Sequence, residues 1–503
     1  MKFVIIRPQM IMPVHVITVQ TSPSIGLAYL AASARKAGHK VSVIDAVGEG
    51  LEISNSVAGV PNVRCLGLPT LDILERIPVD AEVIGIGCTF SMEWVNTREL
   101  MKHIREKFPS VKILAGGEHI SACIDYVFED CQALDLAIIG EGEETLVDLL
   151  NTLSTGGDLS TVNGLVHRLD GKVCKNPRRA RVRDVDSFPE PAWDLFPLRN
   201  YIDSGDMIGV NIGRSMPMLA SRGCPYECAF CSNPIMWGRL WKARDPELLL
   251  AEMKRWIKEY NVTNFDFYDL TAILKKDWLI TMANLIIESG LNITWQLPIG
   301  TRSEVIDEDV VGLLYESGCR HMTYAPESGS EYMLKKIKKK INKKAMLHSI
   351  RAADKAGLKT KAHLLVAFPD ESFKHVMQSY GFAIHLAFVG LHDLAFSPFS
   401  PYPGSELSER LLKEGKIAYS DNYFYSLVEN RCSFSQHLPT WSLNPLCTGG
   451  MILFYGVSFL LRPMRIFSLI KALWSNQEQT KLHSALIRRK KHRRRLISSS
   501  TNK

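Results

Sequence analysis

Hydrophobic residues in the first 150 positions form short runs, separated by stretches in which apolar residues recur every three or four positions. The stretches 26–37, 93–107 and 143–153 have a helical repeat. The short runs predict five strands, at 3–6, 41–44, 83–86, 112–115 and 136–139. Alternating buried strands and helices are typical of a doubly wound parallel α/β sheet, which binds ligands at the carboxyl ends of its strands.

Three loops that follow these strands carry glycine and polar residues. The candidate binding residues are Thr89 and Ser91 after the third strand, Gly116, Gly117 and His119 after the fourth, and Gly140 and Glu141 after the fifth. Glycine lets a ligand approach the backbone closely, although each loop also fits an ordinary tight turn between a strand and a helix. The first strand is not followed by G-x-G-x-x-G, which argues against a dinucleotide site.

The segments 23–30, 37–45, 116–119 and 140–143, taken in this order, resemble the cobalamin-binding domain that precedes many radical S-adenosylmethionine (SAM) enzymes. The resemblance covers residues 1–150 and implies that cobalamin binds at the three loops. The motif D-x-H-x-x-G, whose histidine ligates cobalt in other cobalamin proteins, is absent. We therefore expect no histidine on the lower cobalt face, with His119 touching the edge of the cofactor or closing the turn.

Three cysteines, Cys224, Cys228 and Cys231, follow a short apolar run. Closed structural zinc sites and ordinary iron–sulfur clusters take four protein ligands, and Cys174 and Cys319 lie far away in the sequence. Three thiolates on a four-iron cluster leave one iron open, and that iron can chelate the amino and carboxylate groups of a methionine moiety. The alternatives are a zinc knuckle completed by a distant residue and three buried core cysteines.

The spacing C-x3-C-x2-C, with Phe230 before the last cysteine, resembles the signature of the radical SAM superfamily. That resemblance implies a [4Fe-4S] cluster on Cys224, Cys228 and Cys231, with SAM bound at its open iron. An electron from such a cluster breaks a carbon–sulfur bond of SAM and yields a 5′-deoxyadenosyl radical.

Strand-like and helical segments alternate again after the cysteines, which predicts a partial (βα)6 barrel over residues 216–405. Its expected strands are 216–220, 264–268, 293–296, 321–324, 361–366 and 393–396. Its expected helices are 247–260, 277–289, 308–317, 344–356 and 373–388. Barrel sites lie at the carboxyl ends of the strands, so the loops there are the expected SAM site.

The resemblance to radical SAM enzymes suggests further SAM-binding residues at these loops. Glu327 and Ser328 belong to a Glu-Ser-Gly run that contacts the SAM ribose in similar enzymes, and Arg302 could pair with the SAM carboxylate or form a surface ion pair. The usual Gly-Gly-Glu-Pro run after the second strand is missing, and Gly116-Gly-Glu118 is in the other domain and is not expected to substitute. Asp269 could bind the SAM amino group or cap the turn at Thr271.

The remaining segments predict a linker, a mainly helical C-terminal extension and a tail. Residues 151–215 lack a regular period and indicate an interdomain linker pinned by Trp193 and Phe196. The extension covers 406–475, and the basic tail 476–503 is expected to be disordered. The apolar run 451–461 is shorter than the ~20 residues of a membrane span. With the basic tail it favours either an interfacial segment on anionic lipid or a helix packed on the barrel.

Composition narrows the possible partners and the compartment. The chain has 503 residues, of which 46% are hydrophobic, and its net charge is +7. Residues 488–495 alone carry seven fixed positive charges, so the remainder is nearly neutral and we expect no nucleic-acid partner. The N-terminus has no signal-peptide pattern, and eleven cysteines favour a reducing compartment. We therefore expect a cytoplasmic protein, in possible peripheral contact with the inner face of the membrane through its C-terminus.

The leading functional hypothesis is a cobalamin-dependent radical SAM methyltransferase that acts on an unactivated carbon. Its implied partners are a small-molecule or lipid-like substrate and an electron donor such as flavodoxin or ferredoxin. One alternative is a radical SAM cyclase or oxidase of a large apolar substrate, which does not methylate. Another is a non-catalytic protein that binds only an iron–sulfur cluster or a corrinoid.

Overall fold

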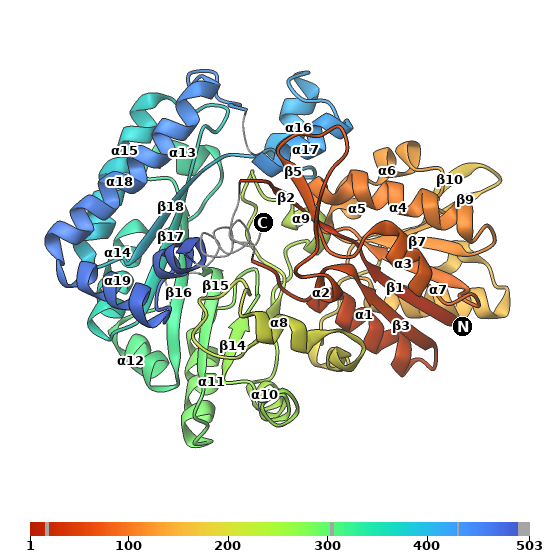
Figure 1. Cartoon of the computed structure of the whole chain (residues 1–503), viewed down its shortest axis with the longest axis horizontal. Helices are drawn as coiled ribbons and strands as arrows, with labels where there is room; N and C mark the ends of the chain where they lie inside the picture. Colours follow the sequence, from red (N-terminus) through yellow and green to blue (C-terminus); the bar gives the residue numbers. More distant parts are fainter. Residues whose placement is uncertain (16–19, 302–305, 430–431, 491–503) are drawn as a thin grey trace, which may run out of the picture.

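The computed structural model describes residues 1–15, 20–301, 306–429 and 432–490. Two α/β units lie side by side in Figure 1, the first coloured red to orange and the second green to blue. The first contains a seven-stranded sheet in the order β10-β9-β8-β7-β6-β1-β3. Its parallel strands are β1 (Lys2–Arg7), β3 (Lys40–Asp45), β6 (Val83–Gly87), β7 (Lys112–Gly116) and β8 (Leu136–Ile138).

Helices flank this sheet where the apolar period predicts them. The three long ones are α1 (Ile25–Lys36), α4 (Trp94–Lys107) and α7 (Glu143–Thr155). Shorter helices are α2 (Ala46–Glu49), α3 (Thr70–Arg76), α5 (Glu118–Ala122) and α6 (Ile124–Asp130). A small antiparallel sheet of β2 (Met10–Pro13), β4 (Ser54–Ser56) and β5 (Val63–Leu66) was not predicted. The doubly wound fold is confirmed.

The first part of the predicted linker is wrong. Strands β9 (Leu165–Leu169) and β10 (Lys172–Lys175) pair antiparallel and extend the first sheet from β8. The two strands are joined by Asp170 and Gly171, both with positive φ, which is the Asp-Gly hairpin turn. Strands this short leave a weak period, because β10 is mostly exposed and only the start of β9 is buried.

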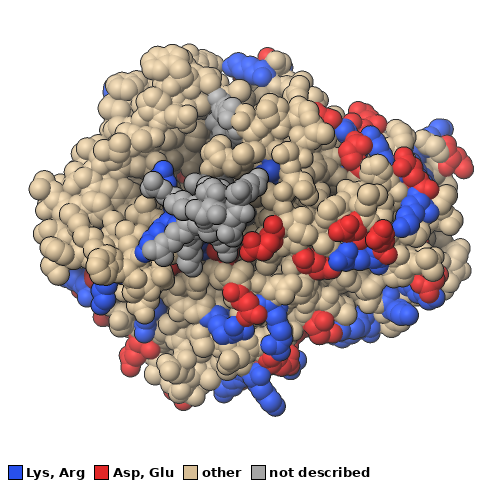
Figure 2. All heavy atoms as spheres, viewed as in Figure 1, with Lys and Arg blue, Asp and Glu red and all other residues tan. Residues whose placement is uncertain are grey.

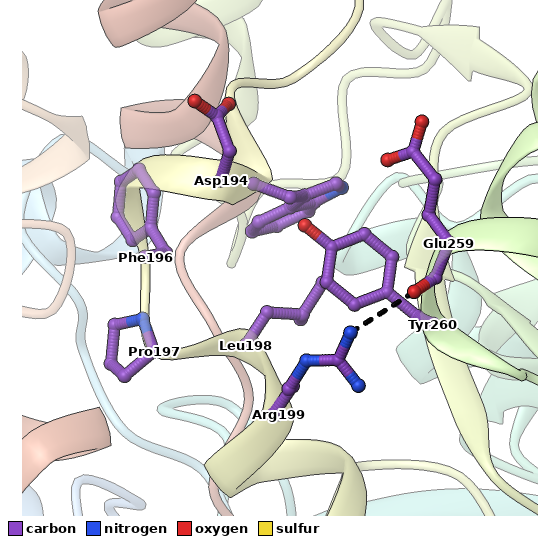
Figure 3. A pocket seen from close by; sticks show the side chains of 8 residues that line it. Asp194, Phe196, Pro197, Leu198, Arg199, Glu259 and Tyr260 are labelled. Carbon is purple, nitrogen blue, oxygen red and sulfur yellow. Dashed lines mark hydrogen bonds between the residues drawn. The ribbon is translucent and has the colours of Figure 1, made fainter.

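The second part of the linker runs over the barrel. Trp193 and Phe196 are buried, as expected of anchors, and α8 (Leu198–Ser204) follows them. Figure 3 shows an open hollow between this segment and the end of α10 (Pro246–Tyr260). There the Arg199 guanidinium lies 5.4 Å from the centre of the Tyr260 ring and donates to the Glu259 carbonyl at 3.1 Å. The contact helps to fix the two α/β units relative to each other.

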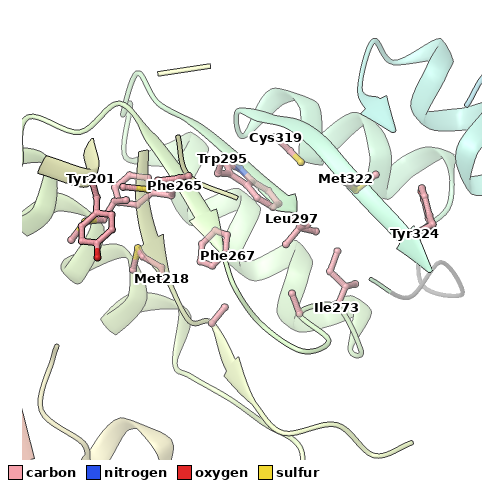
Figure 4. Packing of buried hydrophobic residues seen from close by; sticks show 14 of the residues in the cluster. Tyr201, Met218, Phe265, Phe267, Ile273, Trp295, Leu297, Cys319, Met322 and Tyr324 are labelled. Carbon is pink, nitrogen blue, oxygen red and sulfur yellow. The ribbon is translucent and has the colours of Figure 1, made fainter. Parts of the chain in front are cut away.

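The second unit is the predicted partial barrel, with six parallel strands in the order β11-β14-β15-β16-β17-β18. They are β11 (Ser215–Met218), β14 (Asn264–Phe267), β15 (Thr294–Thr301), β16 (Cys319–Glu327), β17 (Lys359–Val366) and β18 (Asp393–Pro398). The helices are α10, α11 (Lys276–Glu288), α12 (Glu308–Glu316), α13 (Glu331–Lys336), α14 (Lys343–Lys355) and α15 (Phe373–Val389). Figure 4 shows Phe265, Phe267 and Trp295 in the tight packing of this unit's core.

The C-terminal extension is mainly helical, as expected, with α16 (Glu406–Lys413), α17 (Asp421–Glu429), α18 (Leu443–Leu461) and α19 (Met464–Ser475). Helix α17 returns to the first unit, where Arg98 of α4 makes a paired hydrogen bond with Asp421 at 2.9 Å. Helix α18 packs along α15 and β18. The extension therefore contacts both units.

The prediction that residues 476–503 form a disordered tail is wrong for the described part. Residues 481–490 are helical, and the segment before them is partly buried. The backbone N–H groups of Lys481 and Leu482 donate to Asp393 on β18, at 2.6 and 3.3 Å. Glu478 accepts from the N–H of Asn211, which precedes β11. The segment thus bridges the two edges of the open barrel. Its partners, Asp393 of β18 and the stretch before β11, are far away in sequence, so the tail sequence alone does not reveal them.

Candidate functional site

The three cysteines lie in one loop at the carboxyl end of the first barrel strand. The chain leaves β11, forms the short strand β12 (Ser221–Arg222), passes through Cys224, Cys228 and Cys231, and enters α9 (Asn233–Trp237). Cys231 donates its backbone N–H to the Cys228 carbonyl at 3.0 Å, which closes the loop. No disulfide links the described cysteines.

The three thiols are close enough to affect one another. Burial, with a smaller contribution from the neighbouring Glu118, Cys228 and Cys224, raises the pKa of Cys231 to about 12. A metal removes this penalty because it binds the thiolate directly. In the described part of the chain, no group of three His, Cys, Asp or Glu side chains is close enough to hold a single metal ion, which gives no support to the zinc-knuckle alternative. A four-iron cube differs because each thiolate binds its own iron.

Gly223, directly before the first cysteine, has a φ of +85°, and a Cβ there would lie 2.0 Å from the Leu240 carbonyl oxygen. We expect Gly223→Ala to displace the loop and lower the iron bound per chain several-fold, while the barrel still folds. Iron analysis after anaerobic reconstitution, with circular dichroism as the control for folding, tests this. Gly238→Ala is a matched variant: Gly238 also has a positive φ, of +58°, so alanine brings similar backbone strain there, but its Cβ would meet nothing within 4 Å. Equal iron in the two variants would contradict the expectation.

Arg222 ties the cysteine loop to the first unit. Its guanidinium lies between the rings of Tyr29 and Phe188, 4.6 and 4.4 Å from their centres. It also pairs with Glu143 at 2.7 Å and lies 3.7 Å from Glu141. Burial and these acids act on the Arg222 pKa in opposite directions, and the net result is a raised pKa, so the residue stays charged. A buried ion pair of this kind fixes the loop where the two units meet.

A second contact joins the cysteine loop to the glycine-rich loop after β7. Ser232, which follows the last cysteine, donates its hydroxyl to the carboxylate of Glu118. Ser121 accepts from the N–H of Gly140 at 3.1 Å and lies 3.5 Å from the Met236 sulfur of α9. The Gly-Gly-Glu run belongs to the first unit and was not expected to substitute for the missing Gly-Gly-Glu-Pro run, yet its Glu118 reaches the cysteine loop.

The predicted cobalamin-binding residues fall into two groups. Thr89 is exposed, whereas Ser91 and His119 are buried and hydrogen-bonded to each other at 2.9 Å. The His119 ring packs against Trp94 and Phe424, and burial lowers its pKa to about 3. His119 is therefore a neutral core residue that supports the loop from inside, and the structure gives no support to a contact with the edge of a cofactor.

The loop glycines keep the backbone close to its surroundings. Gly117 has a φ of +123°, and a Cβ there would lie 2.3 Å from the Cys88 carbonyl, so the turn itself requires glycine. Gly116 and Gly140 are less crowded, with neighbouring carbonyls 3.9 and 3.6 Å from an added Cβ. The Arg181 guanidinium forms an ion pair with the Glu141 carboxylate at 2.6 Å, so Glu141 stabilises the loop from inside the protein.

Glu327 ends β16 in a left-handed conformation, with a φ of +65°. Its buried carboxylate accepts from Lys339 at 3.1 Å, and burial raises its pKa despite that ammonium. The Lys339 ammonium lies 5.9 Å from the centre of the Phe230 ring, within the cysteine loop. Ser328 faces Ser379 of α15 at 3.3 Å, so its side chain supports the turn. Strained backbone of this kind is concentrated at functional sites.

A second left-handed residue, Ala367 with a φ of +68°, ends the neighbouring strand β17. The N–H groups of Ala367 and Phe368 donate to Glu371, at 2.6 and 3.3 Å. Burial raises the pKa of Glu371 to about 7, and its other carboxylate oxygen has no partner in the described structure. Phe368 lies 5.8 Å from Phe230, which connects this loop to the cysteines. Sequence reasoning singled out neither Glu371 nor Lys339 for these contacts.

The two remaining SAM candidates differ from expectation. Asp269 accepts from the Ala220 N–H at 3.1 Å and the Ser221 hydroxyl at 2.6 Å, and burial raises its pKa to about 6. Asp269 therefore anchors the start of the cysteine loop. The expected capping of the turn at Thr271 is wrong. Because both carboxylate oxygens already accept hydrogen bonds, the structure gives no support to a contact with the SAM amino group. Arg302 lies outside the described residues.

Family comparisons agree with this geometry. Residues 16–150 match the B12 binding domain, and residues 218–383 match the Radical SAM superfamily. The chain therefore combines a B12-binding domain with a radical SAM domain.

Individual relatives extend the similarity over most of the chain. An uncharacterized methyltransferase of Pyrococcus horikoshii is 28% identical, over 90% of this chain and 92% of its own. The cytidylyl-2-hydroxyethylphosphonate methyltransferase of Streptomyces wedmorensis is 27% identical over 78% of each. The solved structure of the radical SAM methyltransferase TsrM from Kitasatospora setae, with cobalamin and a [4Fe-4S] cluster bound, shares the fold. It has a TM-score of 0.63 at 14% identity and covers 85% of this chain and 81% of its own.

Proposed function

We propose that this enzyme is a cobalamin-dependent radical SAM methyltransferase that acts on an unactivated carbon of a small molecule. The observation that carries the proposal is the contact between the cysteine loop and the B12-binding domain, made by Ser232 with Glu118 and by Arg222 with Glu143. The contact holds the positions for the two cofactors next to each other, as methyl transfer between them requires. The methyltransferases named above, similar over most of their length, support the same reaction.

The residues of the chain take the following roles in this proposal. Cys224, Cys228 and Cys231 bind three irons of a [4Fe-4S] cluster and leave the fourth for SAM. Glu327 accepts hydrogen bonds from the SAM ribose hydroxyls, since its carboxylate is held near the loop by Lys339. When bound, the cluster supplies the electron that splits SAM, and cobalamin supplies the methyl group. Thr89, Gly116 and Gly140 line the loops that face cobalamin.

The electron must come from outside the chain. A low-potential carrier such as flavodoxin or ferredoxin meets the requirement, because an iron–sulfur cluster of this type accepts one electron at a time. We propose such a carrier as the protein partner.

Product analysis distinguishes methylation from its alternatives. Each methylation consumes two SAM molecules, and so yields deoxyadenosine and S-adenosylhomocysteine in equal amounts. We expect both products when reconstituted enzyme is incubated with reductant, SAM, hydroxocobalamin and candidate substrates. Deoxyadenosine alone, for every substrate that is turned over, would favour a cyclase or oxidase. Failure of the loaded, reduced protein to cleave SAM would favour a non-catalytic binding protein.

We also propose that helices α18 and α19 rest on a membrane surface. Residues 430–477 contain no Asp or Glu, and nine large apolar side chains between 441 and 474 are exposed. The exposed set is Trp441, Ile452, Leu460, Leu461, Met464, Ile466, Phe467, Ile470 and Trp474. In Figure 2 the surface over α15 and α18 shows almost no charged residues, unlike the first unit. Exposed apolar patches of this kind mark membrane or partner surfaces.

Helix α18 is longer than the sequence suggested. Including the turn before it, the stretch Thr440–Leu461 has 22 residues and a mean hydropathy of 1.4, so it qualifies as a span by length and composition. Its packing along α15 and β18 favours an orientation in the plane of the bilayer. The exposed face carries Lys471, and the sequence continues into the basic run 488–495, which complements anionic lipid.

Vesicle sedimentation tests this location. The full-length protein is expected to bind vesicles of phosphatidylglycerol and phosphatidylcholine, and a Phe467→Ser/Ile470→Ser/Trp474→Ser variant to lose at least about tenfold in affinity, since each buried apolar side chain contributes ~1.5–3 kcal/mol. Leu71→Ser/Val79→Ser, which removes exposed apolar residues from the first unit, should bind as the wild type does. Equal binding by the triple variant would contradict the proposal.

A further inference from the structure

The inside of the barrel carries an unusual set of basic side chains. Along β17 the residues alternate between partly exposed and fully buried, and the partly exposed ones include Lys361, His363 and Leu365. Strand β17 pairs on both sides, with β16 and β18, and its buried residues face the covering helices. The partly exposed side chains therefore point into the barrel.

Neighbouring strands add polar groups to the same interior. His321 and Thr323 lie on neighbouring strand β16, where Thr323 is in register with Lys361 of β17. Both therefore share the face of the sheet that points into the barrel. His321 is 1% exposed, and neither of its ring nitrogens has a hydrogen-bond partner in the described structure, nor does the Thr323 hydroxyl. Buried polar groups in proteins are normally paired, so this set has free hydrogen-bonding capacity for a ligand or for water.

The acids that face this interior already have partners. Asp393, in register with Lys361, accepts from the N–H groups of Lys481 and Leu482 and from the Tyr455 hydroxyl. Asp266 accepts from Asn264, Gln296 and the N–H of Gly209.

The bases do not have partners to the same extent. The Lys481 ammonium donates to the carbonyls of Ile208 and Gly209, whereas Lys361 and His363 form no side-chain hydrogen bond with the described residues. Burial and then the positive charges of Lys361 and Lys481 lower the pKa of His363 to about 3. Besides burial, the positive charges of Lys361 and Lys481 disfavour a further positive charge here, and the same charges attract an anion.

We propose that this interior, centred on Lys361, His363 and His321, binds an oxyanion, a carboxylate or a phosphate-type group, of the substrate. The inference rests on the proposed function and gives its substrate a chemical class. Leu364 of β17 pairs with Glu327 of β16, so His363 lies just below the level of the proposed ribose site. A substrate held by its anionic end at Lys361 would extend its carbon skeleton toward the SAM and cobalamin positions.

Anion binding can be measured without the natural substrate. Calorimetric titration of the reconstituted holoenzyme with inorganic phosphate and, separately, with acetate is expected to show saturable binding of at least one. Lys361→Met should weaken that binding by about tenfold or more, as expected for loss of a charge-assisted contact. His363→Gln should weaken it less. Lys355→Met, which removes an exposed lysine of α14 that pairs with Glu308, should bind as the wild type does.

The outcomes separate the two proposals. Preference for phosphate or for acetate identifies the kind of oxyanion. Either preference supports the site if Lys361→Met weakens the binding. Absence of binding to wild type, or equal binding by Lys361→Met with an unchanged melting temperature, overturns the inference. Wild-type enzyme that cleaves SAM but binds neither anion keeps the proposed function and loses this site. Enzyme that binds an anion but cleaves no SAM keeps this site and loses the proposed function.

Discussion

Cys228→Ala is expected to reduce SAM cleavage by at least about a thousandfold, because two thiolates are too few to retain the four-iron cluster whose open iron binds SAM. The loop itself should persist, since its backbone is held by contacts of Ala229 with Ile337 and Leu407, through hydrogen bonds of 2.9 and 2.8 Å. Iron and sulfide per chain should fall together with the rate of deoxyadenosine formation under anaerobic, reducing conditions.

Cys174→Ala is the matched control, because Cys174 lies on β10 at the far edge of the first sheet and is also partly exposed. It should retain the wild-type iron content and rate. A Cys228→Ala protein with full iron and full cleavage would show that the cluster is held elsewhere.

Glu327→Gln is expected to raise the KM for SAM by about 10- to 100-fold, since a hydrogen bond to a charged group contributes ~1.5–3 kcal/mol. Iron content should stay unchanged, because Glu327 is linked to the cysteine loop indirectly, through Lys339 and the Phe230 ring. The measurement is the SAM dependence of deoxyadenosine formation.

The exposed Glu331, four residues later on α13, provides the control Glu331→Gln, which should leave the KM unchanged. If Glu327→Gln lowers the melting temperature but not the apparent affinity for SAM, the carboxylate serves only the ion pair with Lys339, and the ribose contact is wrong.

Hydrophobic period predicted the two sheets and most of their helices, because buried strands and amphipathic helices impose that pattern locally. It did not predict β9 and β10, in which few positions are buried, although Asp170-Gly171 marked their turn. The ordered segment before residue 490 was missed for another reason. Its partners, Asp393 and the stretch before β11, are far away in sequence, and only the open barrel brings them together.

The site divides in the same way. The cysteine spacing is a local feature, so the sequence alone predicts the cluster ligands. The contacts of Arg222 with Glu143 and of Ser232 with Glu118 depend on how the two units pack together, and the sequence does not show this. Asp269 has the residue type expected of a ligand, yet its neighbours on the adjacent strand occupy it. A single sequence shows residue types, and the fold decides which of them remain available.

The central claim is that Cys224, Cys228 and Cys231 hold a cluster whose open iron binds SAM. Electron paramagnetic resonance of the reduced, reconstituted wild-type protein tests it most directly. Adding SAM is expected to change the spectrum of the reduced cluster, because the amino and carboxylate groups of SAM join the coordination of one iron. A cluster spectrum that SAM leaves unchanged, or a reconstituted protein that shows no cluster signal, would contradict the account.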